Sequence, residues 1–255
     1  MTEVPHWEDE VHGAIKDLIS FVGEQLPHLT TRTAHPRQMA AAYLARMRRL
    51  VLGIDVLYGA GLPDVLGGVL RIAYETWATG MWVLCIGDEA AKLIDAEYVI
   101  RTNQLIERLD LGIDIIPEIE GVPGLPTIRK RIEALEKHLV EEGVSKPGDL
   151  DLTHKIVYDS ESGAGVHAGF TSVVGHLDVD KHDRWIGVHL ERIEEGDGAD
   201  KLLWAASLLT VFARRLFLAF GIGVTRLDEV AAPIQRAATF LAAEYEGDSA
   251  PAKDR

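Results

Sequence analysis

The 255-residue chain contains a single cysteine, Cys85, so no disulfide can form within it. Cys85 lies in the apolar run 82–86 and has no charged or histidine neighbour in sequence, which predicts a small buried side chain rather than a nucleophile. Basic residues are also scarce: 26 Lys and Arg stand against 40 Asp and Glu, a formal net charge of −14. Broad contact with nucleic-acid phosphates needs clustered basic residues, so we expect no such surface.

The first ten residues lack both the basic region and the apolar core of a signal peptide, which predicts a cytoplasmic protein. Long uncharged apolar runs are missing as well. Residues 65–86 contain Arg71 and Glu75, and residues 202–224 contain Arg214 and Arg215. A charge at the centre of a bilayer costs about 3 kcal/mol per residue on insertion scales. We therefore expect buried helices of a bundle and no membrane partner.

Strand-like runs are scarce, and the spacing of apolar residues is mostly helical. The exception is 178–195, which fits a short strand pair or an ordered loop. The sequence predicts an all-α bundle of about seven to eight helices in a single domain over 1–246, with a disordered tail at 247–255. The expected helices cover 8–26, 33–58, 63–86, 88–110, 127–142, 149–176 with a glycine interruption, 199–221 and 226–245.

Arg71 and Glu75 lie one turn apart in an otherwise apolar helix, so they share a face. Because an unpaired buried charge is costly, each should have a partner. A buried structural ion pair is the favoured interpretation, and a functional pair is the alternative. An i,i+4 ion pair is weaker when the Arg precedes the Glu, as it does here. At least one of the two side chains is therefore expected to reach another helix. Arg214 or Arg215 is a candidate partner for Glu75.

The stretch 158–167 gathers hydroxyls, carboxylates and an imidazole. His154, Tyr158 and Ser162 recur every four residues and share a helical face. His167 follows Ser162 by five residues, about 140° round a regular helix, so the two meet only if the glycines between them break it. No Gly-x-Ser-x-Gly turn is present. A polar network or a ligand site at a helix crossing is therefore favoured over covalent catalysis.

Histidine and aspartate also cluster after this stretch. In extended backbone, His176, Asp178, Asp180 and His182 would share one face, and such side chains bind zinc, iron or manganese. No His-Glu-x-x-His motif accompanies them, so an acidic, solvated loop is the favoured interpretation. A divalent metal, with His154 or His167 completing its site, remains the one cofactor alternative.

Arg184 and His189 have four residues between them, which matches the loose spacing of the ribonuclease motif in HEPN domains. Those domains are also all-α bundles and place the motif across a dimer. A second loose match, Arg131 and His138 with six residues between, lies on a helix. Arg131 otherwise belongs to a basic patch, 129–131, that we interpret as a solvated helix face.

The ordered set Arg71…Glu75 and Tyr158…Ser162…His167 resembles bacterial helical proteins known only as a domain of unknown function, over roughly residues 35–225. The resemblance implies that the two helices pack about a polar centre. Some members are similar to HEPN-type or abortive-infection proteins, which suggests phage or stress defence. Three functions follow: a ligand-binding or defence-related protein, a HEPN-like homodimeric ribonuclease, and a metal-dependent hydrolase or oxidase that uses the loop at 176–189.

Overall fold

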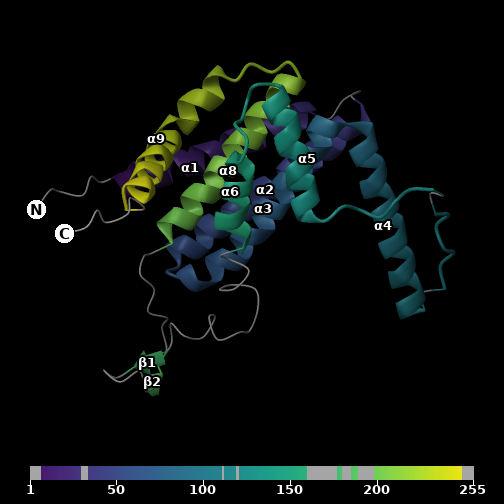
Figure 1. Ribbon diagram of the computed structural model, residues 1–255, viewed down its shortest axis with the longest axis horizontal. Coiled ribbons are helices and arrows are strands. Elements are labelled where there is room, and N and C mark those ends of the chain that lie inside the picture. Colours follow the sequence, from purple (N-terminus) through teal and green to yellow (C-terminus); the bar gives the residue numbers. More distant parts are fainter. Residues whose placement is uncertain are drawn as a thin grey trace, which may run out of the picture.

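The computed structural model describes residues 7–29, 34–110, 112–118, 121–159, 177–179, 185–188 and 198–248. These residues form an all-α fold, as predicted, and they include one small strand pair (Figure 1). The helices are α1 (Trp7–Gln25), α2 (His35–Gly59), α3 (Pro63–Ile86), α4 (Asp88–Leu109), α5 (Ile128–Glu141), α6 (Asp149–Thr153), α8 (Ala199–Ala219) and α9 (Thr225–Asp248), with a 3-10 turn η1 (Leu26–Leu29) and a π-helix η2 (His154–Asp159).

Helix ends follow the proline and glycine signals of the sequence. Pro36 and Pro63 lie in the first turns of α2 and α3, where the missing N–H costs nothing. Gly87 separates α3 from α4 at a φ of 79°, a backbone conformation that favours glycine. Thr127 caps α5, because its hydroxyl accepts a hydrogen bond from the amide of Lys130 at 3.4 Å. The predicted breaks after α2 and α3 are therefore confirmed.

The core lies where α2, α3 and α8 pack against one another, and α9 runs beside α1 at one side of the bundle (Figure 1). Gly80 on α3 marks the closest approach. A Cβ atom at Gly80 would lie 2.3 Å from the Phe212 ring on α8 and 2.8 Å from the Cβ of Tyr43 on α2. A side chain there would push three helices apart, so glycine at this position sets the spacing of the core.

The apolar segments of near-membrane length are both helices of this bundle. Within the described residues, Ala199–Ala219 has the length and apolar composition to cross a membrane. However, 61% of its most apolar 18-residue window is buried inside the bundle. That burial is typical of the core helix of a soluble protein, and the side chains responsible include Phe212 and Phe217.

The least helical segment contains the strand pair that the sequence allowed. β1 (Leu177–Val179) and β2 (Trp185–Val188) are antiparallel, with Leu177 opposite Val188 and an irregularity between Asp178 and Val179. The helix predicted over 149–176 is present as α6 followed by η2. Its glycine-containing part, after Asp159, lies outside the described residues.

Candidate functional site

One face of α3 carries two charged and two aromatic side chains. Arg71, Tyr74, Glu75 and Trp82 are spaced by three, one and seven residues, which places them on one stripe of a helix with 3.6 residues per turn. We call these four residues the α3 stripe. Both α5 and η2 pack on α3, and the contacts below are made from the stripe to these two elements.

Arg71 and Glu75 pair within α3, as predicted. The Nε atom of Arg71 donates to Oε1 of Glu75 at 3.3 Å. The Arg71 side chain is 17% exposed, but that of Glu75 is 43% exposed. The pair is therefore not buried as a unit, which corrects the expectation of a buried ion pair. Glu75 presents its carboxylate at the surface while Arg71 stays mostly covered.

Tyr74 connects α3 to η2. Its hydroxyl lies 3.2 Å from Nδ1 of His154, and both residues are buried. The hydroxyl donates if the imidazole carries its proton on Nε2, and accepts if Nδ1 is protonated. The Tyr74 ring also lies against the Trp77 ring, with centroids 5.6 Å apart. Trp77 is 3% exposed, and its indole N–H has no acceptor among the described residues.

Arg131 fixes α5 to the other end of the α3 stripe. Its Nη1 atom donates to the Thr79 hydroxyl at 2.7 Å and its Nε atom donates to the Pro126 carbonyl at 2.9 Å. The guanidinium lies 5.9 Å from the centre of the Trp82 ring, a cation–π arrangement. Arg131 is therefore turned inward, whereas Arg129 and Lys130 are exposed, so the interpretation of 129–131 as a solvated face is wrong for Arg131 alone. Burial raises the pKa of the nearby Tyr43 hydroxyl, although Arg131 opposes this shift.

Arg215 and Glu142 form an ion pair between α8 and the end of α5. This corrects the prediction that Arg214 or Arg215 pairs with Glu75, since Arg214 bonds Asp228 at 3.2 Å. Arg215 also contacts the Cys85 thiol, so the cysteine has a charged neighbour that the sequence did not reveal. Burial nevertheless raises the pKa of Cys85, and a raised pKa opposes a nucleophilic role.

The later half of the predicted cluster lies outside the described residues. The backbone of Tyr158 belongs to η2, but its side chain is not described, and neither are Ser162 and His167. The same holds for His176, Asp180, His182, Arg184 and His189, and for the side chain of Asp178 in β1. Residues 7–159 and 198–240, in so far as the structure describes them, contain no group of three His, Cys, Asp or Glu placed to hold a metal ion.

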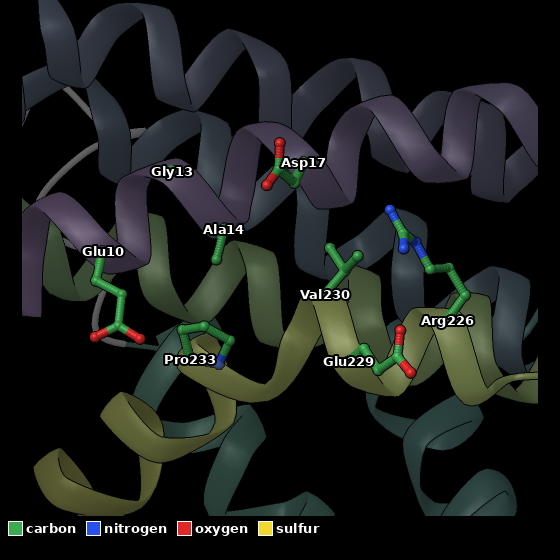
Figure 2. Close-up of a pocket in the computed structure, with 8 residues that line it drawn as sticks. All are labelled: Glu10, Gly13, Ala14, Asp17, Arg226, Glu229, Val230 and Pro233. Atoms are coloured by element: carbon green, nitrogen blue, oxygen red, sulfur yellow. The ribbon is translucent and has the colours of Figure 1, made fainter.

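Two surface grooves lie away from the α3 stripe. The first, about 450 Å³, runs between α1 and α9, and Figure 2 shows three carboxylates and the Arg226 guanidinium around it. Arg236 bonds Glu10 at 2.7 Å at its edge. The second, about 500 Å³, is mostly apolar and lies between the end of α1, η1 and α2. The residues of the first groove are Glu10, Gly13, Ala14, Asp17, Arg226, Glu229, Val230 and Pro233.

No family model, curated protein or solved structure matches this chain. The family resemblance carried by Arg71, Glu75 and the stretch 158–167 remains a prediction, and the site is interpreted from its own geometry.

Proposed function

We propose that this protein binds a small polar ligand at the crossing of α3 and η2, where Tyr74 lies between Trp77 on one side of the helix and Arg71 and Glu75 on the other. The observation that carries the proposal is the buried indole N–H of Trp77, which has no acceptor among the described residues. A buried donor without a partner costs about 1–3 kcal/mol. A ligand that offers an acceptor would recover this energy, and Trp77 lies directly against Tyr74.

The charges of the α3 stripe define the class of ligand. Arg71 supplies a guanidinium, which favours carboxylate and phosphate groups. Glu75 supplies a half-exposed carboxylate one turn away, which favours a hydrogen-bond donor. A ligand with an anionic group and a donor within a few ångströms of each other satisfies both. A nucleoside monophosphate is one chemical class of this kind.

The π-helix η2 supports the same location. Such helices are rare and frequently occur at functional sites. η2 begins at His154, which the Tyr74 hydroxyl fixes against α3. Tyr158 belongs to η2, and Ser162 and His167 follow it in the sequence, so these three residues are proposed to complete the binding site. A cytoplasmic location, and a role in phage or stress defence, belong to the same proposal.

Isothermal titration calorimetry tests this function with inorganic phosphate, citrate and the four nucleoside 5′-monophosphates as probes. We expect one or more probes to bind the wild-type protein and to bind Arg71→Lys and Glu75→Gln at least about tenfold more weakly. The chain offers a matched control: Arg129 and Glu133 have the same spacing and the same 3.3 Å distance on exposed α5 positions. Equal binding by Glu75→Gln and Glu133→Gln, or no binding by the wild type, contradicts the proposal.

A HEPN-like ribonuclease is the second candidate. Arg131 and His138 lie seven residues apart on α5 and so share a face, and each side chain is partly exposed. The pair Arg184 and His189 is the alternative site. Incubating a single-stranded RNA with the wild type, Arg131→Ala/His138→Ala and Arg184→Ala/His189→Ala separates the two. Loss of cleavage in one folded double variant assigns the site, and equal cleavage by all three excludes both assignments.

A further inference from the structure

The groove of about 500 Å³ between the end of α1, η1 and the first half of α2 is lined mostly by apolar atoms. We call it the η1–α2 groove. Its volume is within the range of about 300–1,000 Å³ that ligand sites occupy. One wall comes from α1 and η1, with Gly23, Leu26, Pro27 and Leu29. The other wall comes from α2, and its lining residues are Gln38, Ala41, Ala42 and Ala45.

Two arginines continue the α2 wall beyond one end of the groove. Arg48 follows Ala41 by seven residues and Arg49 follows Ala42 by seven, so each lies on the same helical flank as that alanine. Arg48 is half-buried and Arg49 is exposed. The η1–α2 groove therefore combines apolar walls with a concentration of positive charge at one end.

The guanidinium of Arg48 lies against Gly23, which itself lines the groove. A Cβ atom at Gly23 would be 2.6 Å from Nη2 of Arg48, so the missing side chain leaves the space that the guanidinium occupies. The Nε atom donates to the Ile19 carbonyl at 2.6 Å. The four hydrogens on its Nη atoms have no acceptor within the described part of the chain. A half-buried guanidinium with free donors favours an anionic ligand, above all a carboxylate.

We propose that the η1–α2 groove binds a medium-chain fatty acid, with the carboxylate at Arg48 and Arg49 and the alkyl chain extending toward Gln38. The ten residues from Arg48 to Gln38 span about 15 Å of helix, which matches the length of extended dodecanoate. The alkyl chain gains by leaving water for the leucine and alanine walls. Because the whole chain carries a formal net charge of −14, an anion needs this local pair of cations, and the pair decides which way the ligand lies.

Isothermal titration calorimetry with dodecanoate, below its critical micelle concentration, tests the site. We expect one dodecanoate to bind per chain. Octanoate should bind at least about tenfold more weakly, because it has four fewer methylene groups to bury. Dodecyltrimethylammonium has the same chain and the opposite charge, and it should not bind. A wild type that binds no dodecanoate, or that binds both twelve-carbon probes equally, overturns the proposal.

Arginine substitutions test where the carboxylate lies. Arg48→Met should weaken dodecanoate binding about tenfold, the value of hydrogen bonds to a charged group. Since Arg48 also bonds Ile19, Arg49→Met provides a second test at an exposed position, with an expected loss of about threefold. Arg37→Met is the matched control, because Arg37 is exposed on α2 beyond the opposite end of the groove. It should bind as the wild type does. A loss in Arg37→Met as large as that in Arg48→Met contradicts the placement of the carboxylate.

Filling the groove tests where the alkyl chain lies. Ala45→Leu adds three carbon atoms to the α2 wall and should weaken dodecanoate binding at least about tenfold while leaving Tm unchanged. Ala232→Leu on α9, at a position of similar partial exposure, is the control and should bind as the wild type does. If Ala45→Leu binds dodecanoate with unchanged affinity, the ligand lies elsewhere and the η1–α2 groove is not its site.

Discussion

Tyr74 and His154 are 80 residues apart in the chain and meet in the core, where the Tyr74 hydroxyl lies 3.2 Å from Nδ1 of the imidazole. The contact fixes the beginning of η2 against α3. It thereby sets where the chain continues toward Tyr158, Ser162 and His167. Because both partners are buried, the loss of either removes a hydrogen bond in a place that water does not reach.

The Tyr74→Phe substitution removes that hydroxyl and little else. We expect the free energy of unfolding to fall by about 0.5–1.5 kcal/mol, the usual net contribution of one hydrogen bond. Tyr98→Phe is the control, because the Tyr98 side chain is 66% exposed. Urea denaturation measures both variants. Equal losses of stability would show that the hydroxyl of Tyr74 contributes nothing specific.

Arg131→Lys tests the attachment of α5 to α3. Lysine cannot reproduce the planar set of donors that reaches Thr79 and the Pro126 carbonyl while lying over Trp82. We expect the free energy of unfolding to fall by about 2 kcal/mol. This is the value of two hydrogen bonds from a charged donor, reduced because the lysine ammonium replaces part of them. Arg129→Lys, two residues earlier and 69% exposed, should cost under about 0.5 kcal/mol. A similar loss in both would contradict the inward position of Arg131.

His12 and Asp55 form a second connection, between α1 and α2, with Nε2 and Oδ1 2.5 Å apart. The Asp55 side chain is only 9% exposed, so His12→Ala leaves a buried carboxylate without this partner. We expect a loss of about 2–4 kcal/mol in thermal or urea unfolding. His35 and Asp95 provide the comparison, since they lie 2.7 Å apart at exposed positions. His35→Ala should cost less than about 1 kcal/mol, and a cost equal to that of His12→Ala would show that burial of Asp55 is not decisive.

The ion pair of Arg215 and Glu142 predicts a pH dependence. The hydrogen bond from Arg215 holds the pKa of Glu142 below its ordinary value of 4.5. A carboxyl with a lower pKa in the folded protein stabilises the fold above its unfolded pKa, and this stability is lost as the pH falls through the folded pKa. The difference in Tm between the wild type and Glu142→Gln should therefore be present at neutral pH and disappear in acid. The neighbouring Glu141→Gln, exposed, should show no such change, and a difference that persists in acid would contradict the pairing.

The all-α class and the breaks at Gly59–Pro63 and Gly87 could be predicted because they depend on local signals: helical spacing, proline in first turns and glycine at ends. The pairing of Arg71 with Glu75 is local too. The inward position of Arg131 had a signal that the sequence interpretation missed. Arg131 lies four residues before the buried Leu135 and so shares its face.

The contacts of Cys85, Tyr74 and Arg215 could not be predicted in this way. Each contact depends on which helices are neighbours in space. Glu142 is 73 residues from Arg215 in the sequence, and His154 is 80 residues from Tyr74. Periodicity within one segment says which face is covered, but not by what. The exposure of Glu75 has the same origin, since it depends on where η2 and α5 leave α3 uncovered.

The indole N–H of Trp77 gives the most direct measurement of the proposed site. In ¹⁵N-labelled protein the indole signals of the tryptophans are resolved by NMR, and Trp77→Phe assigns the one of interest. Adding the probe that binds in calorimetry should move the Trp77 indole signal downfield, because the ligand accepts a hydrogen bond from it, and leave the Trp204 signal in place. A ligand-saturated spectrum in which the Trp77 signal is unmoved while another indole signal shifts would place the ligand elsewhere and contradict the site at α3 and η2.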